Sequence, residues 1–230
     1  MPKLLDTLIK LKLIPWDDSR LKKSIPEFEI ESMSEQERAE VVVALRNFQK
    51  VNGGMGLSAI QLGLSIRLFV LGLEKGAEHD CWNPELLESS DTKISWDEGC
   101  LSYPNFYVKI HRPEWVRVAF TNTLGKKEEH TFYGMTARVW QHEFDHQNGI
   151  LFTDRASPVY MKQAFARKKK YERTLRKRAR AKSAEATAEA ENTSKFEESD
   201  VMRSSKKKKV ELWEKWGWEN KTKIGKRENK

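Results

Sequence analysis

The feature that most constrains this chain is the run VWQHEFDH at residues 139–146. It places Glu143 between His142 and His146, inside a predicted helix of about residues 134–148 that Gly149 ends. Because residues four apart share one face of a helix, the two histidines can bind one metal ion together. Glu143 could then take a proton from a water molecule on that ion. The alternative, a surface helix that carries two histidines by chance, is the weaker explanation because His and Glu are scarce.

A catalytic metal needs a third protein ligand. The long metalloprotease pattern would place a third histidine where this chain has Phe152, which cannot bind metal. The thermolysin-like pattern uses a downstream glutamate. The first one is Glu172, but it lies in a dense basic run where pairing with Lys or Arg is the more natural role. Cys100, within EGCLS at residues 98–102, remains as the candidate whose thiolate would complete a site with one position open for water.

Length and cysteine content bound the class of protein. The 230 residues suit one domain of about 150 residues plus an appendage. If Cys100 binds metal, Cys81 is left without a disulfide partner, so we expect a reducing compartment and a cytoplasmic protein. The apolar start is interrupted by charges and lacks the features of a secretory signal. No apolar stretch approaches the ~20 residues of a membrane span, so we expect no membrane association.

The net charge of +8 is unevenly distributed. Residues 1–160 carry 19 Lys and Arg against 23 Asp and Glu, whereas residues 161–230 carry 23 against 11. A mildly acidic body therefore precedes a strongly basic extension. We predict a catalytic domain at residues 1–160, a basic helix at 161–190, and a linker with a Trp/Lys-rich tail at 191–230.

The body is predicted to be α+β, with several short strands laid against the central helix. A first helix should begin at Ser34, which forms a capping box with Glu37, and stop at Gly53. A strand near residues 80–82 should be stopped by Asn83 and Pro84. The other predicted strands are residues 66–71, 93–96, 107–110, 116–120 and 129–133, the last two joined as a hairpin by a turn at 122–125.

A second stretch that could carry chemistry is GMGLSAIQ at residues 54–61. Gly54 and Gly56 allow another backbone to approach closely, so a peptide could pair here as an added strand. Gln61 could donate its side-chain NH₂ group to an oxygen that becomes negative during a reaction. Taken alone this signal is weak, because glycines at a turn usually serve only the turn.

Together, GMGLSAIQ, EGCLS and QHEFDH, in this order and spacing, resemble the three signature motifs of peptide deformylases. The resemblance runs from about Leu13 to Ser157 and is highly specific. It implies an α+β fold in which short antiparallel strands wrap around a central helix that bears the histidines. It also implies a metal-dependent hydrolase of protein biosynthesis, which removes the formyl group from the N-terminal formyl-methionine of nascent proteins and releases formate.

The resemblance also assigns roles to matching positions. Ser58 departs from the family pattern, which more often has alanine, but a hydroxyl there does not threaten the chemistry. The implied metal is Fe²⁺, for which Zn²⁺, Ni²⁺ or Co²⁺ can substitute. The implied roles are metal ligand for Cys100, His142 and His146, general acid and base for Glu143, oxyanion donor for Gln61 and the backbone N–H of Leu101, and substrate contact for Gly56. We expect Gly54, in the same stretch, to contact the substrate as well.

Beyond Asp154 the chain changes character. Ser157 and Pro158 predict a helix start, and the basic run from Arg167 to Lys182 has almost no counter-charge. Like charges one turn apart destabilise a lone helix. A phosphate-rich partner would neutralise this repulsion, and binding would release the counterions held by its phosphates. We expect ribosomal RNA as this partner, because formylated chains emerge from ribosomes. The alternative is a solvated tail that binds nothing specific. Three tryptophans at 213, 216 and 218 predict docking of the tail on the body or on a partner.

Three function classes stay open at this point. A deformylase is the first. A different metal hydrolase, such as a peptidase, is disfavoured by Phe152 and by Cys100 within EGCLS. A catalytically inactive body that serves as an RNA-binding adaptor is disfavoured by the intact set of implied site residues. Glu98 and Arg138 either form an ion pair that supports the site or lie at the surface.

Overall fold

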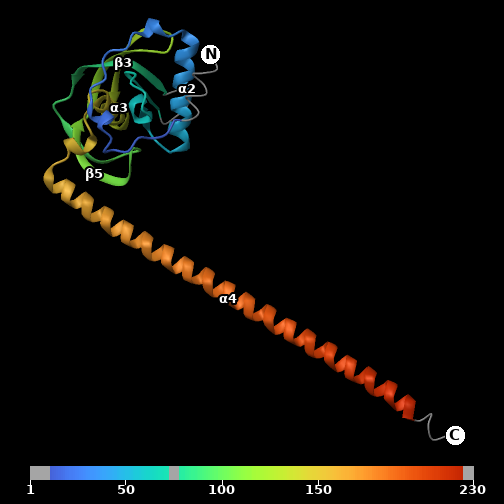
Figure 1. The fold of residues 1–230 in the computed structure, drawn as a ribbon. Coiled ribbons are helices and arrows are strands. Elements are labelled where there is room, and N and C mark those ends of the chain that lie inside the picture. The colour runs from blue at the N-terminus through green and yellow to red at the C-terminus, as the bar shows by residue number, and fades with distance from the viewer. Residues whose placement is uncertain (1–10, 73–77, 225–230) are drawn as a thin grey trace. The chain divides into compact units, whose positions relative to one another are not determined.

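The computed structural model describes the backbone of residues 11–72 and 78–224, and the side chains of 11–72, 78–187 and 202–212. Two units are distinguished, Met1–Lys169 and Lys170–Lys230. The first unit, called the body here, holds two antiparallel sheets, the helices packed on them and, among its described residues, four short 3-10 turns (Figure 1). The predicted α+β class is confirmed.

The main sheet has five strands in the order β1-β2-β3-β6-β7, all antiparallel to their neighbours. Its strands are β1 (Gly56–Ser58), β2 (Leu68–Leu71), β3 (His79–Ser89), β6 (Trp115–Thr121) and β7 (Lys127–Tyr133). The second sheet is a hairpin of β4 (Lys93–Cys100) and β5 (Tyr103–Pro113). The predicted hairpin between residues 116–120 and 129–133 is confirmed as β6 and β7.

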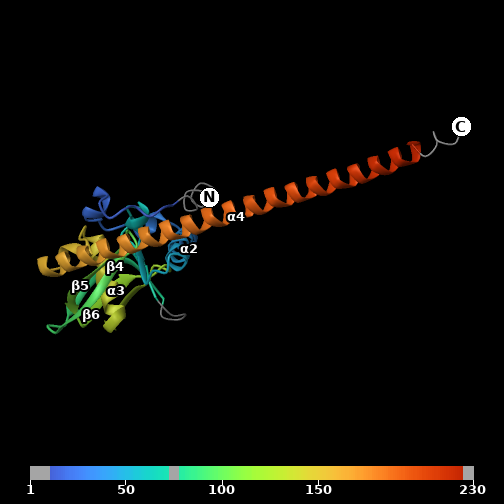
Figure 2. The same cartoon turned by 90° about the horizontal axis from the view of Figure 1, so that it is seen from below.

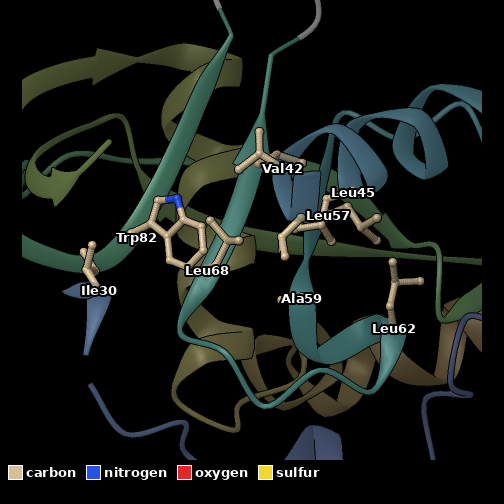
Figure 3. Packing of buried hydrophobic residues seen from close by; sticks show 10 residues of the cluster. Ile30, Val42, Leu45, Leu57, Ala59, Leu62, Leu68 and Trp82 are labelled. Carbon is tan, nitrogen blue, oxygen red and sulfur yellow. The ribbon is translucent and has the colours of Figure 1, made fainter. Parts of the chain in front are cut away.

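Alternation along β2 explains why the main sheet is covered on both faces. Leu68 and Val70 join the core cluster under helix α2 (Glu35–Val51), which Figure 3 shows. Phe69 and Leu71 join the cluster under helix α3 (Gly134–Gln147). Because successive side chains of a strand point to opposite faces, an entirely apolar strand needs cover on both. The two helices therefore pack on opposite faces, with α3 in the middle of the body (Figure 1).

The helix boundaries follow local signals in the sequence. Ser34 and Glu37 form the predicted capping box at the start of α2. Helix α3 spans Gly134–Gln147, close to the predicted range, and Gly149 follows it with a φ of 70°. A Cβ atom at Gly149 would lie 2.8 Å from backbone atoms of Lys22 and Lys23, so only glycine fits this end of the helix.

The prediction that Asn83 and Pro84 stop a strand was wrong. Strand β3 continues through them to Ser89, with a register shift between Trp82 and Glu85. Asn83 adopts a φ of 47°, and its side-chain amide exchanges two hydrogen bonds with the backbone of Phe28. The pair therefore forms a bulge instead of a strand end, because a segment distant in the sequence satisfies its polar groups.

Helix α4 (Pro158–Ile224) begins at the predicted residue and its first turns pack on the β4–β5 hairpin. Ala164 is buried, and the Phe165 ring lies 5.1 Å from that of Phe106. Figure 2 shows β4, β5 and β6 beside α3 in the same unit. The body as a compact unit runs to Lys169, and the catalytic-domain end at residue 160 stays a prediction.

The second unit is helical as far as Ile224. Residues 191–205, at the start of the predicted linker and tail, thus have helical backbone. The predicted docking of the tryptophans at 213, 216 and 218 lies outside the described side chains. Among the described residues, no helix combines the length and apolar character that crossing a bilayer requires.

Candidate metal centre

The structure brings Cys100, His142 and His146 together. Cys100 ends β4 where the hairpin register shifts, and the two histidines lie one turn apart on α3. One ligand atom from each lies within 4.8 Å of the others, and Cys100 Sγ is 3.4 Å from His146 Nε2. Both histidines are buried, whereas Cys100 is partly exposed to a pocket.

This donor set fits a divalent transition metal. One thiolate and two imidazoles match the ligand preferences of Zn²⁺ and Fe²⁺, and three protein ligands leave a position open on the pocket side. His146 Nδ1 is buried without a hydrogen-bond partner among the described residues. The cluster therefore has the chemistry of a catalytic metal site, not a closed structural one.

Glu98 orients His142. Its Oε2 lies 3.3 Å from His142 Nδ1, so the ring turns its other nitrogen toward Cys100 and His146. Burial opposes ionisation of Glu98, but hydrogen bonds from His142 and Arg112 outweigh it and hold the pKa of Glu98 well below 4.5. A carboxylate behind a ligating histidine fixes its tautomer and strengthens it as a ligand.

A buried ion-pair network extends from Glu98. Arg112 donates to both Glu98 oxygens at 2.8 and 2.9 Å and to Asp145 at 2.8 Å. Arg138 donates to Glu98 at 2.5 Å, as the sequence suggested, and Arg155 donates to Asp145 at 2.6 Å. Sequence reasoning missed Arg112. The alternation of buried residues along β5 could have indicated it, because Arg112 continues the inward face of this strand, which is otherwise apolar.

Glu143 lies on the pocket side of α3 and is 4 % exposed. Burial raises the pKa of its carboxyl group, which the nearby His142 charge and a hydrogen bond from Ser58 partly offset. A raised carboxyl pKa suits a group that must both take and give a proton near neutral pH. The close approach of Glu143 to Gly56 leaves no room for a side chain at position 56.

Gln61 aims its amide at the metal centre. Its Oε1 accepts a hydrogen bond from the Ser58 backbone N–H at 2.9 Å, which fixes the orientation of the amide. Its Nε2 therefore lies 3.3 Å from Cys100 Sγ and 3.3 Å from Ser102 Oγ. The NH₂ group is thus held beside the candidate metal ligands, which is the position where a donor to a developing oxyanion is needed.

A pocket of about 540 Å³ opens over these groups. Trp140, next to this site on α3, is wholly buried in the core and does not line the pocket. The implied site residues Gly54, Gly56 and Leu101 lie in the pocket wall, as do Met135 and Val139. All eight predicted site residues are thus at or beside one cavity.

The chain is similar to known proteins. Residues 10–162 match the polypeptide deformylase family. A peptide deformylase from Thermotoga petrophila is 44% identical over 117 residues, which are 50% of this chain and 69% of that protein. One from Mesorhizobium japonicum is 43% identical over 110 residues, covering 46% of this chain and 62% of that protein.

Solved structures agree as well. The crystal structure of a peptide deformylase from Thermotoga maritima has a TM-score of 0.59 and 35% identity, covering 64% of this chain and 98% of that one. A peptide deformylase from Synechococcus elongatus in complex with actinonin has a TM-score of 0.63 and 29% identity, covering 69% and 86%. The chain belongs to the polypeptide deformylase family of metal-dependent hydrolases, which remove the N-formyl group from nascent peptides.

Proposed function

We propose that this chain hydrolyses the formamide of N-terminal formyl-methionine, with Cys100, His142 and His146 as metal ligands and Glu143 as acid and base. The observation that carries the proposal is the convergence of three donor atoms within 4.8 Å beside the buried Glu143. Fe²⁺ is the proposed ion, with Zn²⁺, Ni²⁺ or Co²⁺ able to replace it. Such an ion supplies the Lewis acidity that makes water a nucleophile near neutral pH.

The protein groups handle the protons and the charge. Glu143 accepts a proton as water adds to the formyl carbon, and later gives it to the departing amine nitrogen. The Gln61 NH₂ group and the Leu101 backbone N–H donate to the negative charge on the formyl oxygen. The carbon–nitrogen bond then breaks, leaving formate and a free N-terminus. The formamide itself is neutral, so the donors stabilise the transition state more than the substrate.

The position of β1 supports binding of an extended peptide. Strand β1 is at one edge of the main sheet, and both it and Gly54 border the pocket. Backbone N–H and C=O groups on an edge strand can pair with another chain. Gly54 and Gly56 would allow this pairing close to Glu143, while Met135 and Val139 would provide apolar walls for the methionine side chain.

Formate release tests the proposal. Anaerobically purified protein loaded with Fe²⁺ should release formate from formyl-Met-Ala and leave Met-Ala and acetyl-Met-Ala intact. Glu143→Gln should lower kcat by about 10²–10⁴-fold while the protein keeps its metal. Cleavage of unformylated peptides would favour the peptidase alternative. Full activity in Glu143→Gln would remove Glu143 from the mechanism.

We also propose that the basic segment, defined as residues 167–182, contacts ribosomal RNA. The Arg and Lys side chains at 173, 176, 177, 178, 180 and 182 are all exposed along one helix, without ion pairs among the described residues. Phosphate groups would relieve this repulsion by releasing counterions.

The reducing cytoplasm is the proposed place of action, because both cysteines are free and a thiolate ligand must stay reduced.

Ribosome sedimentation at several salt concentrations tests this contact. Replacing those six residues with Gln should weaken binding and flatten its salt dependence. The matched control replaces Lys206, Lys207, Lys208 and Lys209 with Gln, which removes charge from the same helix at another place. Equal loss in both variants would indicate non-specific attraction. Binding unaffected by salt or by the six-residue variant would contradict the proposal.

A further inference from the structure

The hydroxyl of Ser58 contacts the carboxylate of Glu143 inside the body. Ser58 Oγ lies 2.8 Å from Glu143 Oε2 and 3.2 Å from the Glu143 carbonyl oxygen, and Ser58 is fully buried. The contact joins the end of β1 to the helix that carries the histidines. A hydroxyl has one proton to donate, and an ionised carboxylate is a stronger acceptor than a peptide carbonyl. The Ser58 proton is therefore directed to Oε2.

Gln147 fixes this direction. Its Nε2 donates to Ser58 Oγ over 3.1 Å and to the carbonyl oxygen of Leu68 over 3.4 Å. A carbonyl oxygen can only accept, so Leu68 requires the NH₂ end of the Gln147 amide on this side. Since Gln147 occupies a lone pair of the Ser58 oxygen, the hydroxyl proton turns away from Gln147 and toward Glu143. Both residues are wholly buried, which shields the arrangement from solvent.

The two oxygens of Glu143 thus have different surroundings. Oε2 accepts from Ser58, whereas Oε1 lies beside Gly56, where an added Cβ atom would be 2.6 Å away. Gly56 borders the pocket and Ser58 does not. One oxygen is held by the protein and the other is left free for proton transfer.

We propose that Ser58 is a positioning residue: its hydroxyl, oriented by Gln147, holds Glu143 Oε2 and so presents Oε1 to the pocket. This inference rests on the proposed role of Glu143 as acid and base. An alanine at position 58 cannot donate this hydrogen bond, so the Glu143 side chain would be free to rotate away from its productive position. The ligands and the pocket walls would stay in place.

The first test separates kcat from KM. Ser58→Ala should lower kcat for formyl-Met-Ala roughly 3- to 10-fold, with KM and metal content unchanged. Ser58→Thr, which keeps a hydroxyl, should stay within about 2-fold of the natural chain. Gln147→Met should lower kcat in the same way and add nothing to Ser58→Ala, because both act through one hydrogen-bond chain. Additive losses, or a rise in KM in place of a fall in kcat, would overturn the proposal.

The second test places Ser58→Ala in the Glu143→Gln background. If Ser58 acts through the carboxylate, the second substitution should change kcat by less than about 1.5-fold there. Cys81→Ala is the control, since it removes one buried atom from β3 without touching Glu143, and it should leave kcat unchanged. An inactive Glu143→Gln with an unimpaired Ser58→Ala would refute only the role of Ser58. Full activity in Glu143→Gln would refute the proposed role of Glu143 as acid and base, and only a natural chain that releases no formate would refute the proposed function.

Discussion

Gly56 faces Glu143 so closely that a Cβ atom at position 56 would lie 2.6 Å from Glu143 Oε1 and 2.8 Å from its Cγ. Gly56 thus fits beside the pocket only because it has no side chain. A side chain here would have to displace the group on which the proposed proton transfers depend. The glycine that seemed a weak sign in the sequence therefore marks a close steric constraint at the site.

Gly56→Ala should lower kcat by about 10²-fold, because a displacement near 1 Å can cost this much in rate. Metal content and the far-UV spectrum should stay as in the natural chain. Gly54→Ala is the comparison variant at the same loop: its Cβ would meet Leu101 Cδ1 at 2.7 Å, the end of a flexible side chain, and the Gly56 carbonyl oxygen at 3.2 Å, so it should lower kcat less than Gly56→Ala. Equal losses in the two variants would indicate a general disturbance of the loop instead of displacement of Glu143.

The two cysteines should differ in their effect on metal. Cys100→Ala should lose most bound metal on dialysis and with it formate release, because two imidazoles alone hold a catalytic ion weakly. Cys81→Ala should keep the metal, since Cys81 is fully buried in the core on β3 and outside the donor cluster. Metal analysis by mass spectrometry checks both. Stoichiometric metal in Cys100→Ala would exclude the thiolate as ligand.

Peroxide should act at Cys100. A thiolate on Fe²⁺ beside an open pocket is oxidisable, whereas burial raises the pKa of Cys81 and keeps its thiol protonated. Exposure of the Fe²⁺-loaded protein to peroxide should abolish activity and add oxygen to the peptide that contains Cys100. Stable activity under air with Fe²⁺ bound, or oxygen found on Cys81 first, would contradict this.

Glu98 should make the fold sensitive to acid. Because hydrogen bonds from His142 and Arg112 keep its folded pKa below the unfolded value near 4.5, ionised Glu98 stabilises the fold above about pH 4.5. That stability is lost as the pH falls toward the folded pKa. Glu98→Gln should lower the free energy of unfolding at pH 7 by about 3 kcal/mol, since Arg138 and Arg112 lose their buried partner. It should also flatten the dependence of stability on pH below 4.5.

Urea unfolding of metal-free protein between pH 7 and pH 3 measures this effect. The control is Glu88→Gln, which removes an exposed carboxylate paired with Arg117 and should cost less than about 1 kcal/mol. In the metal-bound protein, Glu98→Gln should also weaken metal affinity about 10–100-fold, because His142 loses the carboxylate that orients it. Unchanged affinity would assign Glu98 to the fold alone.

The first turns of α4 should belong to the catalytic body. A chain shortened after Lys169 should keep the unfolding free energy of the body and its kcat. A chain shortened after Ser157 should lose about 2 kcal/mol, because it removes the buried Ala164 and the Phe165 ring that covers Phe106. Urea unfolding of the two shortened chains compares them directly. Equal stability would show that the α4 contacts contribute nothing.

The sequence by itself determined the elements whose cause is local. The capping box at Ser34, the end of α3 before Gly149 and the β6–β7 hairpin depend on neighbours a few residues away, so pattern alone predicts them. The spacing of His142 and His146 placed both on one helical face for the same reason. Residue chemistry left Cys100 as the candidate third ligand, and the family resemblance then implied the same role for it.

Only the tertiary structure decided which distant residues meet. Nothing local indicates that Arg112 joins Glu98 to Asp145, that Asn83 is satisfied by Phe28, or that Gln147 orients Ser58. Such contacts arise where the sheet and α3 close on each other, and a buried polar group must find a partner wherever packing brings one. Local patterns set periodicity, but packing across the core sets which atoms come within hydrogen-bonding distance.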